Sequence, residues 1–310
     1  MSRPDHPPDG GRPRELLTER HRPELTDLDL ATTGELVALM VAEDRLVPAA
    51  VEQAADAIVP AIEAVTERLR AGGRLIYVGA GTAGRLGIMD AAECGPTFSM
   101  PAGRVVGVLA GGEDAFDAAV EDAEDQVEAG AAALDALEVG RDDAVVGITA
   151  SGRTPFVLGA IERARGLGAA TVGISCNPGA ALSARVDHPV EVVVGPELIA
   201  GSTRLKAGTA QKLLLNMIST IAMIRLGKTY GNLMVDVRAT NEKLRHRARR
   251  IVQQATGADE GTARRALAAA DDEIRTAIVI VARGISAEEA RRRLAHAPSL
   301  RAALEGDGCG

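Results

Sequence analysis

Five short runs of branched apolar residues, separated by longer amphipathic segments, are the feature that most constrains the fold of this 310-residue chain. Strands covered by helices on both faces have such continuous Val- and Ile-rich runs, whereas half-exposed strands alternate apolar and polar residues. The amphipathic segments between the runs supply helical crossovers between parallel strands. The pattern predicts an α/β fold, a five-stranded parallel sheet flanked by helices in a three-layer sandwich, with strands at residues 75–78, 105–109, 144–148, 171–175 and 190–194.

The sequence divides into a tail, a main domain and a small C-terminal unit. Residues 1–22 are rich in proline, glycine and charge, so we expect a disordered tail that is neither a signal peptide nor a membrane anchor. Residues 23–243 hold N-terminal helices and the predicted sheet. Residues 244–310 contain short amphipathic segments joined by Gly257 and Gly284, which predict a small helical bundle that docks on the main domain.

Charge and cysteine content restrict the partners of the chain. A formal net charge of −8 argues against a general nucleic-acid or anionic-membrane partner, because such surfaces attract basic patches. The basic run at residues 238–250 is interpreted as a solvated helix face, with an anion-binding face as the alternative. Cys94, Cys176 and Cys309 predict neither a disulfide framework nor a zinc site, which fits a reducing cytoplasm.

A glycine-rich loop follows the first predicted strand. Gly79, Gly81 and Gly84 satisfy the G-x-G-x-x-G pattern of dinucleotide-binding proteins, and the loop leads into a helical segment. A nucleotide site also needs an acidic residue at the tip of the second strand, where this chain has Ala-Gly-Gly and only then Glu113. Three interpretations stay open here: a nucleotide site, a site for another phosphate, and a structural glycine turn.

A second loop, after the third predicted strand, carries hydroxyl groups. Ser151 and Thr154 flank Gly152 just before Pro155, at the expected start of a helix. Free backbone N–H groups and hydroxyls at such a point bind phosphate, although helix capping explains the same residues equally well. Two such loops at one sheet edge favour a sugar phosphate, which is held at its phosphate by one loop and at its hydroxyls by the other.

Acidic residues are the remaining candidates for chemistry. Glu93 lies near the end of the first crossover helix, and Glu121, Asp122, Glu124 and Asp125 form an acidic cluster. Paired carboxylates can act as general acid and general base, whereas the plain alternative for each is a solvated helix face. The histidines are scattered, and no metal-binding motif or nucleophile elbow is present, so we expect acid–base chemistry without a metal.

The chain resembles the N-acetylmuramic acid 6-phosphate etherase family, bacterial members of the sugar isomerase (SIS) domain superfamily. The resemblance covers residues 15–305 in order and rests on the runs GRLIYVGAGTAGRLGIMDAAECGPTF, VGVLAGGEDAFDAAVEDAED, VVGITASGRTPFVLGAIERARGLGAATVGISCNPGA, GPELIAGSTRLKAGTAQKLLLNMIST and GKTYGNLMVDVRATNEKLRHRA. It implies a SIS-type, Rossmann-like sandwich, a C-terminal unit that resembles ubiquitin-associated domains, and a homodimer. It also implies cleavage of the D-lactyl ether of N-acetylmuramic acid 6-phosphate without metal or redox cofactor, by elimination and hydration.

The resemblance also implies roles for individual residues. Glu93 corresponds to the proton donor, which has to be desolvated to stay protonated, and Glu124 corresponds to the base, which has to be ionised and better hydrated. The positions expected to bind the sugar phosphate are Thr82, Arg85, Ser151, Gly152, Thr154 and Lys206. For Arg85 and Lys206 the alternative is pairing with acidic helices or with a partner subunit.

Two features fit the resemblance less well. Ala83 replaces the serine of the family pattern G-A-G-T-S-G-R, which removes a hydroxyl expected at the ligand. An unbroken helix from Thr82 would carry Glu93 roughly 15 Å from the loop at about 1.5 Å per residue. We therefore expect either that this helix is interrupted or that Glu93 completes a site with a neighbouring subunit.

Two other functions remain as alternatives. A noncatalytic sugar-phosphate sensor uses the same fold, but it leaves the Glu93 and Glu124 pair without a role. A sugar-phosphate isomerase shares ring opening and proton abstraction, but it needs no proton donor to a leaving ether. Glu93 therefore discriminates between the etherase and the isomerase.

Overall fold

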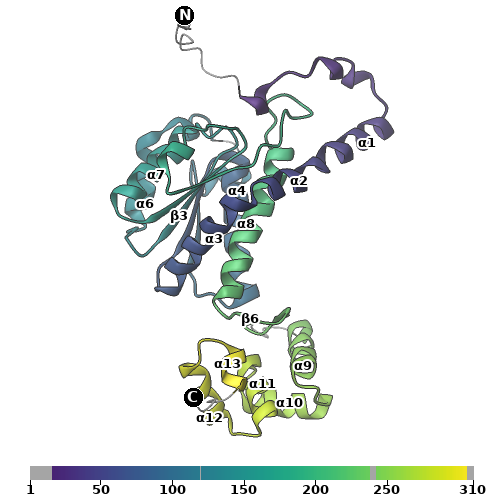
Figure 1. Ribbon diagram of the computed structural model, residues 1–310, viewed down its shortest axis with the longest axis vertical. Coiled ribbons are helices and arrows are strands. Elements are labelled where there is room, and N and C mark those ends of the chain that lie inside the picture. The colour runs from purple at the N-terminus through teal and green to yellow at the C-terminus, as the bar shows by residue number, and fades with distance from the viewer. Residues whose placement is uncertain (1–15, 119, 238–241, 306–310) are drawn as a thin grey trace, which may run out of the picture.

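The computed structural model describes residues 16–118, 120–237 and 242–305. Its main domain is built on a five-stranded sheet in the order β2-β1-β3-β4-β5, with every neighbouring pair parallel (Figure 1). The five strands are β1 (Leu75–Gly79), β2 (Val105–Leu109), β3 (Ala144–Ile148), β4 (Ala170–Ser175) and β5 (His188–Glu191). The predicted fold class is confirmed, and four of the strands lie where the apolar runs placed them.

Burial explains why the strands lack alternation. Every residue of β1, β3 and β4 is buried, because helices cover both faces of these strands. The fifth strand is the exception, since it begins at His188 and ends at Glu191 instead of spanning 190–194. The N–H of Val192 still donates to Ser175 at 2.8 Å, but β4 ends at Ser175 and offers the following residues no partner.

Two helical layers enclose the sheet. One face packs against α3 (Ala55–Arg70), α4 (Gly81–Phe98) and α8 (Lys206–Arg225), which share one apolar core with inward-facing strand residues. The other face packs against α6 (Val127–Ala136) and α7 (Pro155–Gly166), through a second core that includes Ile76, Val78 and Val145. Short helical turns, α5 (Asp114–Asp117), η4 (Ala123–Asp125) and η5 (Ser183–Arg185), lie in the connections.

The N-terminal segment forms an arm beside the main domain. It comprises η1 (Leu17–Glu19), η2 (Pro23–Leu25), η3 (Leu28–Leu30), α1 (Thr33–Asp44) and α2 (Leu46–Gln53), and in Figure 1 α1 extends away from the sheet. Residues 1–15 of the expected tail lie outside the described residues, but residues 16–22 are ordered, contrary to the expectation of a tail up to residue 22. The reason is that Thr18 is buried and hydrogen-bonded to the end of β4.

The C-terminal unit has its own core. It contains the hairpin β6 (Thr229–Tyr230) and β7 (Leu233–Met234), followed by α9 (Glu242–Thr256), α10 (Glu260–Ala269), α11 (Ile274–Arg283), α12 (Ala287–His296) and α13 (Leu300–Glu305). Val235 and Val237 are buried in this core, so it includes residues that precede the expected boundary at residue 244.

Within residues 16–118, 120–237 and 242–305, no helix is long and apolar enough to cross a membrane.

Candidate active site

The sheet order places a candidate site between β1 and β3. Strand β1 connects to β2 on one side and pairs with β3 on the other, so the chain changes direction across the sheet at this point. Ligands of open α/β sheets bind beyond the carboxyl ends of the strands at such a switch point. The helices that follow these two strands, α4 and α7, begin without a side-chain cap, which leaves N–H groups of both first turns directed at this edge.

The glycines of the first loop each satisfy a steric need. Gly81 has a φ of +52°, a conformation that other residues rarely adopt. A Cβ on Gly79 would lie 2.6 Å from the nitrogen of Gly84, and a Cβ on Gly84 would lie 2.6 Å from the carbonyl oxygen of Gly79. The loop therefore brings α4 into close contact with β1. This packing accounts for the G-x-G-x-x-G pattern whether or not a nucleotide binds.

Thr82 places the glycine loop next to the start of α8. Its Cγ2 lies 3.4 Å from the position that a Cβ on Gly208 would occupy, so Thr82 is in van der Waals contact range of the first turns of that helix. The neighbouring Ala83, which replaces the family serine, is 7% exposed and packs into the apolar core. A hydroxyl at position 83 would need a partner inside this core.

The hydroxyl loop after β3 is internally bonded. The hydroxyl of buried Thr149 lies 2.7 Å from that of Thr154 and 3.2 Å from that of Ser151, and the N–H of Arg153 donates to Ser151 at 3.1 Å. Gly152 has a φ of +68°, and a Cβ there would lie 2.3 Å from the Cβ of Ala180. Gly152 is thus required by backbone conformation and space, while Ser151 and Thr154 stay half-exposed at the sheet edge.

Arg85 holds the segment that leads to the acidic cluster. Its Nε donates to the carbonyl oxygen of Phe116 at 2.8 Å, and its Nη2 donates to those of Ala115 at 2.8 Å and Ala118 at 3.3 Å. The guanidinium is therefore engaged with backbone carbonyls in this chain. The contact between Arg85 and the phosphate of a substrate, which the resemblance implies, stays a prediction.

Lys206 is buried at the first turn of α8 and is paired with the arm. Its side chain is 3% exposed, and its Nζ lies 2.5 Å from Oε2 of Glu43 on α1. Glu43 also binds Arg22 at 2.7 Å. Burial favours the neutral form of Glu43, but hydrogen bonds from Lys206 and Arg22 outweigh it and lower the pKa of this carboxyl. Pairing with an acidic helix, the alternative expected for Lys206, is observed.

Glu197 is a candidate that the sequence reasoning missed. It is fully buried, and its carboxylate accepts the N–H groups of Lys206 at 3.1 Å and Ala207 at 2.9 Å, so it caps α8 at the sheet edge. Burial raises its pKa above the ordinary value despite these bonds. The only sequence signal was a glutamate nine residues before Lys206, in a run already used for the resemblance.

Asn177 is the second residue that the sequence reasoning missed. It is buried at the end of β4, where its Oδ1 accepts the N–H of Leu17 at 2.7 Å. Its Nδ2 donates to the hydroxyl of Thr18 at 3.0 Å and to the carbonyl oxygen of Ala150 at 2.9 Å. One amide thus fixes the N-terminal segment and the hydroxyl loop together. Its loop, residues 175–179, follows β4 at the same edge of the sheet.

Glu93 lies far along α4 from the glycine loop. The helix runs without interruption from Gly81 to Phe98, so the expected interruption is wrong. Pro96 does not break it because the helix ends two residues later, so the lost hydrogen bond and the steric conflict of the proline ring fall in the last turn. Glu93 is exposed in the single chain and lacks the desolvation expected of a proton donor. The remaining expectation is that a neighbouring subunit completes its site.

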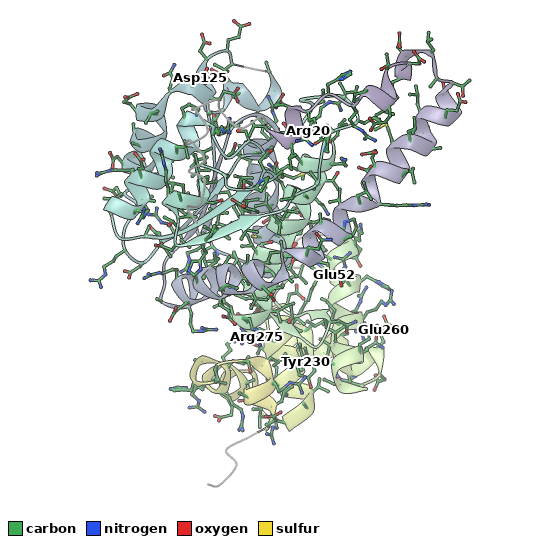
Figure 2. The ribbon with its side chains drawn as sticks, turned by 45° about the horizontal axis from the view of Figure 1, so that its top comes forward. Arg20, Glu52, Asp125, Tyr230, Glu260 and Arg275 are labelled. Atoms are coloured by element: carbon green, nitrogen blue, oxygen red, sulfur yellow. The ribbon has the colours of Figure 1, made fainter. Side chains whose placement is uncertain are left out.

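Glu124 belongs to the opposite helical layer. It lies in η4, directly before α6, and the start of α6 packs on α7, where a Cβ on Gly159 would lie 2.1 Å from the carbonyl oxygen of Val127. Glu124 is exposed, and its role as the base stays a prediction. Figure 2 places the adjacent Asp125 at the end of the molecule opposite Tyr230 and Arg275 of the C-terminal unit. One chain therefore presents Glu93 and Glu124 on opposite sides of the sheet.

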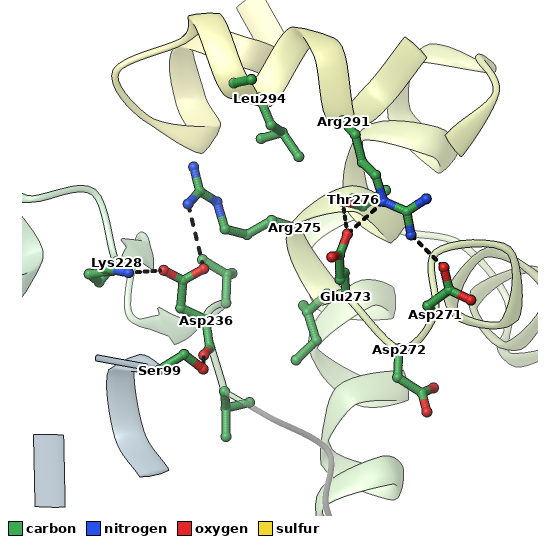
Figure 3. A pocket seen from close by; sticks show the side chains of 14 residues that line it. Ser99, Lys228, Asp236, Asp271, Asp272, Glu273, Arg275, Thr276, Arg291 and Leu294 are labelled. Carbon is green, nitrogen blue, oxygen red and sulfur yellow. Dashed lines mark hydrogen bonds and ion pairs between the residues drawn. The ribbon is translucent and has the colours of Figure 1, made fainter. Parts of the chain in front are cut away.

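A cavity of about 770 Å³ lies away from the strand ends, between the end of α4 and the C-terminal unit (Figure 3). Its cations are already paired: Asp236 lies 2.9 Å from Lys228 and 3.5 Å from Arg275, and Arg291 binds two carboxylates. We therefore place the candidate site at the sheet edge, where backbone N–H groups and hydroxyls converge, and not in this cavity.

The described residues offer neither a cluster of metal-binding side chains nor an activated thiol. Within the part of the chain that the structure describes, no three His, Cys, Asp or Glu side chains are grouped so as to hold a metal ion. Burial raises the pKa of Cys94 and of Cys176 to about 12, so neither thiol is activated as a nucleophile.

Family models match the two structural units. The SIS domain model matches residues 123–221, the N-terminal SIS domain of glucokinase regulatory protein matches residues 57–165, and the C-terminal lid domain of that protein matches residues 231–271. Together with the sheet order and the loops at its switch point, these matches define the chain as a SIS-domain protein.

Relatives of nearly equal length identify the family. The chain is 65% identical over 290 residues to the N-acetylmuramic acid 6-phosphate etherase of Rubrobacter xylanophilus, covering 94% of this chain and 96% of that protein. It is 56% identical over 304 residues to that of Streptomyces coelicolor, covering 98% of each. The chain belongs to the N-acetylmuramic acid 6-phosphate etherase family. Among solved structures, it is similar to a phosphoheptose isomerase from Neisseria gonorrhoeae, with a TM-score of 0.47, 20% identity, and coverage of 62% of this chain and 98% of that one.

Proposed function

We propose that this chain cleaves the D-lactyl ether of N-acetylmuramic acid 6-phosphate, giving N-acetylglucosamine 6-phosphate and D-lactate in the cytoplasm. The observation that carries the proposal is the 65% identity, over nearly the whole chain, to a relative that bears the name of this etherase. The uncapped starts of α4 and α7 and the hydroxyls of Ser151 and Thr154 support binding of a phosphorylated sugar.

The first chemical step requires a base. Opening of the sugar ring exposes an aldehyde at C1, which makes the proton on C2 acidic enough for a carboxylate to remove. Glu124 takes this proton, because its exposed carboxylate is accessible to a bound substrate. The electron pair left at C2 is delocalised onto the aldehyde oxygen.

The second step requires an acid. The electron pair from C2 forms a double bond to C3 and expels the lactyl ether, whose oxygen receives a proton from Glu93 as the C3–O bond breaks. Water then adds to C3 of the unsaturated aldehyde, and C2 regains a proton. The net change is hydrolysis of the ether, with no change in oxidation state.

A homodimer brings the two carboxylates together in this proposal. Because α4 is unbroken and exposes Glu93 on its surface, the donor of one site comes from the second subunit, whose packing supplies the desolvation absent from a single chain. The arm is the proposed contact, since α1 buries no residue and exposes Val37 at 58%, Met40 at 44% and Val41 at 45%.

The test is direct. Purified protein is incubated with N-acetylmuramic acid 6-phosphate, and D-lactate release and exchange of the C2 proton with D₂O are measured. We expect lactate from the wild type, loss of both readouts in Glu124→Ala, and loss of lactate with retained exchange in Glu93→Ala.

Each alternative has its own outcome. Absence of lactate from the wild type removes the etherase function. Exchange with production of a ketose identifies an isomerase, and sugar-phosphate binding without any turnover identifies a sensor. Unchanged cleavage in either variant removes the role proposed for that glutamate.

A further inference from the structure

Asp90 is a buried carboxylate that the reaction described above does not use. It lies on α4 three residues before Glu93 and is 6% exposed. Burial raises its pKa above the ordinary value. Burying a carboxyl group costs desolvation free energy, which an apolar side chain at the same place would not cost. The hydrogen-bond partners of Asp90 therefore have to account for its presence.

Three hydrogen bonds tie Asp90 to two different elements. The hydroxyl of Tyr77 on β1 donates to Oδ2 at 2.9 Å. On α8, the amide of Asn216 donates to Oδ1 at 2.7 Å, and the hydroxyl of Ser219 donates to the same oxygen at 3.2 Å. The middle of α4 is therefore held to the sheet and to α8 by directional bonds at one point.

Two inward-facing glycines of α4 do not provide such direction. Gly84 and Gly87 let the helix approach β1 closely, since a Cβ on Gly87 would lie 2.9 Å from the Cβ of Tyr77. Small residues fix the distance between helix and sheet, but their smooth surface leaves rotation and sliding of the helix weakly defined. The hydrogen bonds of Asp90 define the rotation of α4 and its position along the helix axis, and they do so about one turn before Glu93.

We propose that Asp90 is a positioning residue for Glu93, holding α4 in the rotation and height at which the Glu93 carboxyl reaches the leaving ether oxygen. The inference rests on the proposed function. It assigns Asp90 no contact with substrate. Displacement of a catalytic group by about 1 Å is enough to slow a reaction by roughly 100-fold, so a small shift of α4 suffices.

The experiment compares Asp90→Ala and Asp90→Asn with the wild type in the full-length protein. Lactate release gives kcat and KM, and C2 proton exchange reports the step assigned to Glu124. For Asp90→Ala we expect kcat for lactate release to fall roughly 10- to 100-fold, with KM and exchange within about threefold of wild type. Asp90→Asn keeps an oxygen for Asn216 and Ser219 and offers its NH₂ to the oxygen of Tyr77, so it recovers most of the lost kcat.

Two controls separate positioning from a general loss of structure. Asp143 is equally buried, at 5% exposed, and binds Arg74 at the other end of the strands, so Asp143→Asn should leave the ratio of exchange to cleavage unchanged. In a Glu93→Gln background, Asp90→Ala should not lower the residual rate of lactate release any further, because Asp90 acts only through Glu93. If Asp90→Ala does not fold, the double variant Asn216→Ala/Ser219→Ala is tested in its place, because it removes two of the three hydrogen-bond donors to Asp90.

The outcomes distinguish this inference from the proposed function. If the wild type releases no lactate, the proposed function fails first. If the wild type is active but the Asp90 variants lower exchange and cleavage equally, or lower cleavage equally in the Glu93→Gln background, Asp90 is not a positioning residue for Glu93. Wild-type kcat in Asp90→Ala also overturns the inference.

Discussion

Asp143 and Asp90 are both buried, but their pKa values are shifted in opposite directions. Burial favours the neutral form of Asp143, yet the Arg74 side chain and the N–H groups of Gly140 and Arg74 hold its pKa below the ordinary value. Asp90 meets only uncharged donors in its hydrogen bonds, and its pKa is raised. A guanidinium at 2.7 Å accounts for the difference.

This difference predicts a pH effect on stability. Because the folded-state pKa of Asp143 is lowered, the free energy of unfolding contains a contribution that is fully present above the unfolded pKa of about 3.9 and is lost as the pH falls through the folded pKa. Urea unfolding between pH 7 and pH 3 should therefore show a smaller acid loss for Asp143→Asn than for the wild type. Equal losses in the two proteins would contradict the assignment.

At the residue scale, sequence reasoning found groups that act near their own position in the chain. Gly79, Gly81 and Gly84 were recognisable because one strand–turn–helix unit explains all three. Glu197, Asn177 and Asp90 were not assigned, because the partners that make them notable depend on tertiary packing. Asp90, for example, binds Asn216, which is 126 residues away in sequence.

At the scale of elements, one side chain of α4 ties down the carbonyl groups of residues 115–118, the segment before the acidic cluster. Arg85 on α4 donates to the carbonyl oxygens of Ala115, Phe116 and Ala118, and thereby fixes the chain that leads to Glu124. Glu93, the proposed proton donor, and Arg85, which holds the segment before Glu124, thus lie on the same helix.

Replacing Arg85 should therefore affect the base and not the donor. In Arg85→Ala we expect C2 proton exchange and lactate release to slow together, by roughly 10-fold, because loosening of residues 113–118 misplaces Glu124. Hydrogen exchange of residues 113–125 measures the loosening. Slower lactate release with normal proton exchange would instead link Arg85 to Glu93.

Strand positions were predictable where burial on both faces left only apolar residues, as in 144–148, which matches β3. The half-buried edge strand β2 also matches its predicted range, 105–109, because its residues are apolar as well. The fifth strand was misplaced because Val192 and Val194 are buried but lie beyond Glu191, the last residue in register with β4, and a run of apolar residues does not reveal where a neighbouring strand ends. The uninterrupted α4 was likewise not decided by sequence, since Pro96 permits either a break or a last turn.

At the scale of the whole molecule, the proposed site needs two chains. If each site takes Glu124 from one subunit and Glu93 from the other, a mixed dimer of Glu93→Ala and Glu124→Ala chains contains one intact site. Equal amounts of the two inactive variants, unfolded and refolded together, should regain about one quarter of wild-type lactate release, since half of the dimers are mixed. A mixture that remains inactive while dimers form would place both residues of each site in one chain.

The arm has a consequence for how the protein becomes stable. Helix α1 has twelve residues, a capping box formed by Thr32 and Glu35, and no buried side chain. Isolated helices shorter than about 12–15 residues are marginal in water, so local hydrogen bonds alone do not keep α1 folded. The ion pair between Glu43 and Lys206 ties the end of α1 to the main domain, and in the proposed dimer the second subunit stabilises the rest of the helix, so assembly becomes part of the folding reaction. The temperature of thermal unfolding then rises with protein concentration.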